Sequence, residues 1–158
     1  MYRIGFSKDI HQLVENRKLI LAGVTIPFEK GEKAHSDGDV VIHALSEAIL
    51  GALALGDLGT HFPDNDDKYL NIDSSIILKT VKEMMLEKSY EINNIDISIS
   101  LEKPKIKPYI LLMRQTLAAI LDIDIDLLSI KAGTNEKMDA VGRGEAVEAT
   151  AIVLLKSR

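Results

Sequence analysis

The chain has 158 residues, of which 46% are hydrophobic and 27% charged, and its formal net charge is -5 at pH 7. This length and composition predict one globular domain spanning residues 1–158. The negative charge and the lack of a basic stripe argue against nucleic acid as a partner. No apolar run reaches membrane-spanning length and no signal peptide is recognisable, so a membrane partner is not expected. The absence of cysteine excludes disulfides and thiolate metal ligands, and we expect a cytoplasmic protein.

The predicted elements follow the order β-β-α-α-β-α-β-β. Strands at residues 1–7 and 19–26 are expected to pair as a hairpin, and a loop at 27–38 leads into a helix from Asp39 to about Leu55. The remaining elements are a loop at 56–67, a helix near 74–88, a strand at 95–101, a helix ending near Leu121, and strands at 128–132 and 145–155. This order predicts an α+β sandwich with helices packed on one face of a small sheet.

All four histidines lie within the first 61 residues, and each has a carboxylate nearby. Asp9 and His11, two residues apart, point to the same face if the chain is extended there. With His43 on the predicted helix they make a two-histidine, one-carboxylate set, which is common for Zn²⁺ with an open fourth position. The alternative is a solvated strand end, together with a solvated histidine between the helix acids Asp39 and Glu47.

Two loops carry further candidates. In A-H-S-D-G-D, residues 34–39, His35 and Ser36 could bind a phosphate beside free backbone N–H groups, or Ser36 or Asp37 could simply cap the helix. After G-D-L-G, Asp57 and Asp64 could accept hydrogen bonds from substrate hydroxyls, or belong to a solvated acidic loop. The residues leave both choices open.

A late turn, K-A-G-T-N-E-K, presents Thr134, Glu136 and Lys137 together. A hydroxyl, a carboxylate and an ammonium group in one turn suit a metal-diphosphate, with Glu136 as a ligand of Mg²⁺. The alternative is an exposed polar hairpin. Arg143, in G-R-G-E, could clamp an anion or pair with Glu145.

With D-I-H, A-H-S-D-G-D-V, G-D-L-G-T-H-F-P-D and T-N-E-K followed by G-R-G-E in this order, the whole chain resembles the 2-C-methyl-D-erythritol 2,4-cyclodiphosphate synthase family of the non-mevalonate isoprenoid pathway. The resemblance implies a ferredoxin-like subunit and a homotrimer with active sites between subunits. It also implies a CMP-forming lyase whose small-molecule substrate is a cytidine diphosphate derivative, 4-diphosphocytidyl-2-C-methyl-D-erythritol 2-phosphate. The 2-phosphate of this substrate attacks the β-phosphate, which produces the cyclodiphosphate.

The resemblance also implies roles for residues at matching positions. Asp9, His11 and His43 match zinc ligands, and Glu136 matches the ligand of a second divalent ion, Mg²⁺ or Mn²⁺. The implied catalytic residues are His35, Ser36, Thr134, Glu136 and Lys137. The implied substrate-binding residues are Asp57, Gly59, Phe62, Asp64, Pro104, Lys105, Ala132, Gly133, Thr134 and Arg143. Five of them match a cytidine pocket from the adjacent subunit: Pro104, Lys105, Ala132, Gly133 and Thr134.

The sequence departs from the usual family pattern at three places. Ser7 stands where a glycine is usual, Gly133 stands where a threonine is common, and residues 138–141 replace a stretch that often carries a phenylalanine near the trimer axis. Two other functions remain to be weighed from the residues. One is a zinc-dependent phosphohydrolase, and the other is a non-catalytic trimeric nucleotide-binding protein.

Overall fold

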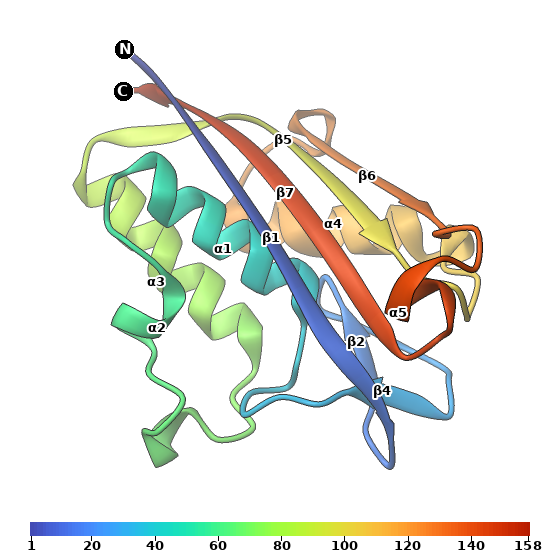
Figure 1. The fold of residues 1–158 in the computed structure, drawn as a ribbon. Helices are drawn as coiled ribbons and strands as arrows, with labels where there is room; N and C mark the ends of the chain where they lie inside the picture. The colour runs from blue at the N-terminus through green and yellow to red at the C-terminus, as the bar shows by residue number, and fades with distance from the viewer.

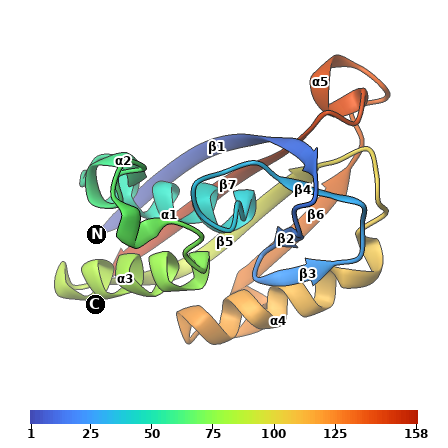
Figure 2. The same ribbon diagram turned by 90° about the horizontal axis from the view of Figure 1, so that it is seen from below.

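The computed structural model describes residues 1–158 and consists of a twisted sheet with three long helices packed on one of its faces. Figure 1 shows the sheet in front of α1, α3 and α4, and the view from below in Figure 2 places these helices together on one side. The two chain termini lie side by side at one end of the sheet (Figure 1). The predicted α+β class, with helices on one face of a sheet, is confirmed.

The large sheet has five strands and is mostly antiparallel. Its spatial order is β4 (Lys30–Glu32), β1 (Tyr2–Glu15), β7 (Ala146–Ser157), β5 (Tyr90–Ser100) and β6 (Leu128–Gly133). Only β5 and β6 run parallel to each other. Their carboxyl ends therefore meet at one edge of the sheet, where Ser100 pairs with Gly133.

The predicted hairpin between residues 1–7 and 19–26 is wrong. The first strand continues to Glu15 and pairs with β7, whereas residues 19–26 form their own small hairpin, β2 (Leu19–Leu21) with β3 (Val24–Ile26). The turn between them has Ala22 and Gly23 at φ values of 53° and 75°, the backbone of tight hairpin turns. Alternation of apolar residues identifies a strand but not its partner. Asp9 therefore lies inside a strand rather than at its end.

The predicted helices are present, with small changes at their ends. The helices are α1 (Val40–Ala52), α2 (Leu58–His61), α3 (Ser74–Glu87), α4 (Ile110–Leu121) and α5 (Asp139–Gly142), with 3₁₀ turns at Asp67–Tyr69, Lys107–Tyr109 and Ile125–Leu127. The short helix α2 falls in a segment predicted as a loop, and α5 falls between the last two predicted strands, where no helix was predicted. Asp39 caps α1 through bonds from Val41 and Ile42, so the cap is neither Ser36 nor Asp37.

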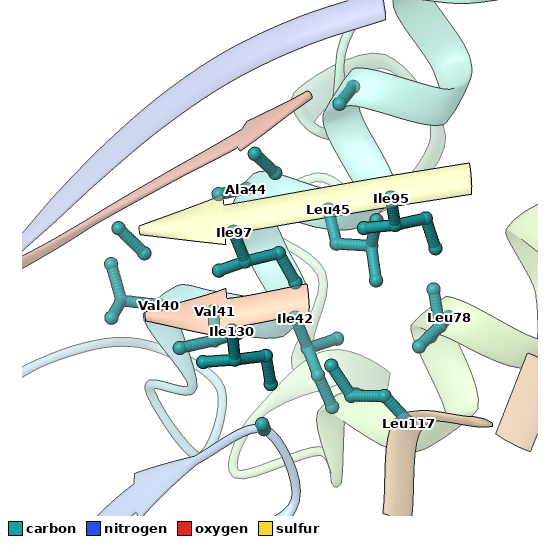
Figure 3. Packing of buried hydrophobic residues seen from close by; sticks show 14 of the residues in the cluster. Val40, Val41, Ile42, Ala44, Leu45, Leu78, Ile95, Ile97, Leu117 and Ile130 are labelled. Atoms are coloured by element: carbon teal, nitrogen blue, oxygen red, sulfur yellow. The ribbon is translucent and has the colours of Figure 1, made fainter. Parts of the chain in front are cut away.

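The core is a cluster of 36 buried hydrophobic residues between the sheet and the helices. Figure 3 shows Leu45 of α1 beside Ile95 and Ile97 of β5, with Leu78 and Leu117 from the other helices close by. Helix α1 is buried along nearly its whole length, including both flanks. It is therefore held firmly in place, and so is any functional side chain that it carries.

Alternation along β1 separates two faces with different surroundings. Gly5 and Ser7 are buried against the helix layer, while Ile4 and Phe6 on the opposite face are 71% and 63% exposed. Ile152 of β7, the cross-strand partner of Phe6, is 42% exposed. The face without helices thus carries a contiguous apolar surface, a feature that often marks an interface.

None of the helices combines the length with the apolar composition that crossing a membrane requires.

Candidate active site

A cleft of about 380 Å³ lies between β1, the loop that precedes α1, the first half of α1, α2 and the segment that follows α2. It collects eight residues singled out from the sequence: Asp9, His11, His35, Ser36, His43, Gly59, Phe62 and Asp64. These residues are spread over 56 positions of the chain, so only the fold brings them together.

Asp9, His11 and His43 form a compact cluster in the wall of this cleft. The Oδ2 atom of Asp9 lies 3.0 Å from Nε2 of His11 and 3.5 Å from Nδ1 of His43. One ligand atom from each residue lies within 4.8 Å of the other two. A tetrahedral ion with bonds near 2 Å holds its ligand atoms about 3.3 Å apart, so this donor set could hold a metal ion.

The placement of the cluster follows from local structure. Asp9 and His11 are on the same face of β1 as the buried Gly5 and Ser7, and this face packs against α1. His43 lies in the first turns of α1, on the side that meets the strand. The period of two along β1 and the packing of α1 against this strand bring the three side chains together.

The electrostatics favour a charged carboxylate here. Burial opposes ionisation of Asp9, but its close contacts with His11 and His43, and the positive charge that these imidazoles carry when protonated, prevail and hold the pKa of Asp9 below its usual range. Burial also opposes protonation of His11, yet the bond and the charge of Asp9 prevail and raise its pKa. Asp9 is therefore available in the ionised form that metal binding requires.

The loop at 33–38 closes one side of the cleft, and Arg17 holds it in place through two hydrogen bonds to backbone carbonyl groups. Arg17 donates from Nε to the carbonyl of Glu32 at 3.0 Å and from Nη2 to the carbonyl of Ser36 at 2.8 Å. The Oγ atom of Ser36 accepts from the N–H of Gly38 at 3.1 Å, and Nε2 of His35 lies 3.2 Å from the carbonyl of Asp66. The sequence carried no signal for this role of Arg17.

Glu47 is a second cleft residue that the sequence did not single out as functional. It accepts from Oγ of Ser7 at 2.8 Å and from the N–H of Leu58 at 3.2 Å. Ser7, which replaces the usual family glycine, is thus satisfied by a hydrogen bond between β1 and α1. The helical spacing of Glu47 four residues after His43 was the signal that could have placed it on the cleft side. Lys33 and Tyr69 also line the cleft without having been predicted.

The residues predicted for the nucleotide lie elsewhere. Pro104, Lys105, Ala132, Gly133 and Thr134 line a separate pocket of about 170 Å³ at the carboxyl ends of β5 and β6. This pocket and the metal-side cleft share no residue. Within one chain, the structure therefore separates the residues predicted for the nucleotide from those of the metal-side cleft.

The turn before α5 has an unusual backbone. Glu136 and Lys137 adopt φ values of 53° and 62°, and the N–H of Glu136 bonds to Oγ of Thr134 at 3.3 Å. Left-handed backbone at residues other than glycine costs about 1–3 kcal/mol each and is concentrated at functional sites. The segment leads into a short helix rather than forming the exposed hairpin considered from the sequence.

Two further candidates have partners within the chain. Asp57 caps α2 by accepting from the N–H and the hydroxyl of Thr60, and it does not line the cleft. Arg143 pairs with Glu145 at 3.1 Å, and both side chains are more than half exposed. Lys137 and Arg143 line a third pocket beside α5.

The comparison with known proteins agrees with this geometry over nearly the whole chain. The sequence model of the YgbB family matches residues 2–156. The chain belongs to the YgbB family. A curated member from Brachyspira hyodysenteriae, named 2-C-methyl-D-erythritol 2,4-cyclodiphosphate synthase, is 58% identical over 154 residues, which cover 98% of each chain.

Solved structures are also similar to this chain over nearly its whole length. The bifunctional IspDF from Campylobacter jejuni has a TM-score of 0.96 and 41% identity; the match covers all of this chain but 43% of that one. The CDP complex of IspF from Plasmodium falciparum has a TM-score of 0.87 and 34% identity, with 99% and 97% of the two chains covered. The family identified from the sequence, and its enzymatic synthase function in isoprenoid biosynthesis, are confirmed.

One buried acid of this YgbB chain, close to the loop at 33–38, titrates unusually. Glu32 is fully buried; Oε2 accepts from the N–H of Ile20, whereas Oε1 has no hydrogen-bond partner. Burial, and secondarily the charge of Asp39, raise the pKa of Glu32 to about 9 from 4.5. Because the folded state keeps this proton up to about pH 9 and the unfolded state loses it above about pH 4.5, the group reduces stability as pH rises between these values.

Glu32→Gln is therefore expected to make the protein more stable at neutral and alkaline pH. From pH 4.5 to pH 7 the unfavourable contribution amounts to about 3 kcal/mol, and the uncharged amide removes it. Urea denaturation from pH 5 to pH 9 measures the difference between variant and parent, which should widen as pH rises. The exposed Glu29→Gln is the matched control and should show no such trend. A constant difference for Glu32→Gln would mean that Glu32 is ionised in the folded protein.

Proposed function

We propose that the protein converts 4-diphosphocytidyl-2-C-methyl-D-erythritol 2-phosphate to 2-C-methyl-D-erythritol 2,4-cyclodiphosphate and CMP, with divalent metals as cofactors. The observation that carries this proposal is the cluster of Asp9, His11 and His43 in the wall of a cleft. It occurs in a chain 58% identical to a curated synthase. The cluster would hold the cation that chemistry between two phosphate groups requires.

The reaction does not need a general base, since the nucleophile is already an anionic phosphate. An oxygen of the 2-phosphate forms a bond to the β-phosphorus, and the bond from this phosphorus to the bridging oxygen of CMP breaks. CMP leaves with the electron pair. The obstacles are repulsion between the phosphates and the negative charge that develops on the leaving group, both of which are reduced by positioning and by cations.

We assign zinc to Asp9, His11 and His43, and a second ion, Mg²⁺ or Mn²⁺, to Glu136. When bound, these cations neutralise phosphoryl charge and make the β-phosphorus more electrophilic. On the chain itself, Lys33, His35 and Ser36 line the cleft and can donate hydrogen bonds to a phosphate.

Other residues orient the rest of the substrate. Gly59, Phe62 and Asp64 line the far side of the cleft, where they can contact the methylerythritol part. Asp57 and Arg143 are retained as substrate contacts from the family resemblance, although each has a partner within the chain. Thr134 and Lys137 are the donors that we assign to the diphosphate.

We further propose that residues 1–158 form one ferredoxin-like domain that assembles as a homotrimer in the cytoplasm, with active sites between subunits. Two observations support this assembly. The nucleotide pocket at Pro104–Lys105 and the metal-side cleft are separate within one chain, so a neighbouring copy can complete the site. The open sheet face exposes apolar side chains, among them Ile4 and Phe6, that an interface would bury.

Product analysis tests the reaction. The purified protein is incubated with the substrate and a divalent cation, and the products are followed by phosphorus NMR. We expect free CMP and two mutually coupled phosphorus signals from the cyclic diphosphate. Inorganic phosphate or an open-chain diphosphate would instead identify a zinc-dependent phosphohydrolase, and unchanged substrate a nucleotide-binding protein.

Glu136→Gln tests the second metal site. The amide keeps the shape of the side chain but loses the charge that attracts Mg²⁺ or Mn²⁺, so the activity should require about tenfold more of the added cation. Zinc content, measured by elemental analysis, should not change. Glu87→Gln, which alters an exposed acid at the end of α3, serves as the control. An unchanged cation dependence for Glu136→Gln would remove this residue from the second site.

A further inference from the structure

His43 contacts a buried hydroxyl on the side of its ring that faces away from Asp9. Nε2 of His43 lies 3.0 Å from Oγ of Ser74. Ser74 is the first residue of α3 and is fully buried. Ser74 in turn contacts Asp37 twice. Its hydroxyl is 2.5 Å from Oδ1 of Asp37, and its N–H donates to Oδ2 at 3.0 Å. Asp37, Ser74 and His43 thus form a chain of hydrogen bonds that leads to the candidate metal site.

The direction of the protons in this chain follows from the groups involved. A carboxylate only accepts, so the hydroxyl proton of Ser74 is directed to Asp37. The Oγ atom of Ser74 can then only accept from His43, which places a proton on Nε2 of the imidazole. In the neutral imidazole, Nδ1 of His43 is then left with the lone pair, and this atom faces Asp9.

Ser36 also approaches His43, and its role is different. Its Oγ lies 3.1 Å from Nε2 of His43 and accepts from the N–H of Gly38. Ser36 has no acceptor that binds its own proton, so its hydroxyl alone would permit either direction of the bond to His43. Only Ser74, whose proton is committed to Asp37, specifies the tautomer.

His11 is held in the opposite way. Its Nδ1 lies 2.6 Å from the carbonyl oxygen of Gly38, which has no proton to give, so Nδ1 must donate. In the neutral imidazole, the lone pair of His11 is therefore on Nε2, which faces Asp9 at 3.0 Å. The two histidines present different nitrogens to one point because different groups bind their outer nitrogens.

We propose that Asp37 and Ser74 are positioning residues, which hold His43 in the tautomer with a free Nδ1 lone pair and in the ring orientation that metal binding needs. This proposal rests on the metal-dependent function proposed above. Partners of this kind typically contribute a factor of about 10 to 100 to metal affinity. A purely structural role, in which Ser74 only joins α3 to the loop at 33–38, would leave the tautomer of His43 unaffected.

Zinc affinity is the first test. Competition with a chromophoric chelator should show about 10- to 100-fold weaker zinc binding by Ser74→Ala than by the parent protein. Ser75→Ala is the matched control, because Ser75 is the next residue on α3 and its hydroxyl makes no hydrogen bond in the chain. Its affinity should equal that of the parent. Equal zinc binding by Ser74→Ala and Ser75→Ala would overturn the proposal.

The tautomer is the second test, and it does not depend on the stability of a variant. In nitrogen-15 spectra of the metal-free parent, recorded where the imidazoles are neutral, His43 should carry its proton on Nε2 and His11 on Nδ1. A proton on Nδ1 of His43 would overturn the proposal. If the parent bound no zinc at all, the metal-dependent function would fail, while the tautomer would still decide the role of Ser74.

Discussion

Gly5→Ala is expected to destabilise the protein by about 3 kcal/mol or more, because the added methyl group has no space. A Cβ atom at Gly5 would lie 1.8 Å from the carbonyl oxygen of Ala48 and 2.9 Å from Cβ of Ala52. The nearest of these atoms is backbone in α1, which cannot rotate away. The helix and β1 would have to move apart at the place where they pack most closely.

Gly51→Ala provides the matched control for this prediction. Gly51 is an exposed position in α1, and a Cβ atom there meets nothing within 4 Å. Alanine is favoured over glycine inside a helix by up to about 1 kcal/mol, so this variant should be as stable as the parent or more stable. Urea denaturation measures both. Equal stability of the two variants would show that β1 and α1 can separate without cost.

The same pair of variants also reports on the candidate metal site. Asp9 and His11 lie on β1 and His43 on α1, so a displacement between the two elements changes the distances between the ligand atoms. Zinc affinity should therefore fall in Gly5→Ala but not in Gly51→Ala. This would connect a contact in the core with the geometry of the site.

His43→Ala is expected to lower bound zinc to well below one ion per chain and to reduce activity at least about 100-fold. Two protein ligands, Asp9 and His11, would remain, too few for a stable zinc site. The loss of several kcal/mol of charge stabilisation in the transition state accounts for the effect on rate. Elemental analysis of the purified variant and the product assay measure the two quantities.

His61→Ala serves as the control for the loss of an imidazole. His61 lies outside the cluster and its Nε2 approaches the carbonyl oxygen of Leu55 at 2.8 Å. This variant should keep its zinc. Full zinc occupancy in His43→Ala would exclude His43 as a ligand and, with it, the assignment of the cluster.

Much of the fold was visible in local patterns, and the failures share one cause. The helical periods predicted the three long helices, the alternation along β5 predicted a strand with one buried face, and the order of elements predicted the α+β class. The hairpin proposed for residues 1–7 and 19–26 was wrong, because apolar alternation says that a strand has a buried face without saying which strand lies beside it. The segment of α2 was predicted as a loop, because a helix of four residues is too short to show a helical period.

The residues of the candidate site also differ in whether local sequence patterns could identify them. The motifs contain the residue types and the local spacing that put Asp9 and His11 on one face and His43 on a helix. They do not contain Arg17, which ties the loop at 33–38, or Ser74, which lies 31 residues from the histidine that it contacts. No local period connects such positions.

The amino-acid sequence alone was sufficient for the family, the class of reaction and the candidate ligands, because these depend on residue types in a fixed order. The tertiary structure decided how closely β1 approaches α1, which nitrogen each histidine presents, and that the nucleotide pocket lies apart from the metal-side cleft. These properties depend on packing between segments distant in the chain. Gly5 allows the close approach of β1 to α1, and we assign the orientation of His43 to the buried hydroxyl of Ser74 at the start of α3. Neither residue has a signature in its own neighbourhood of the sequence.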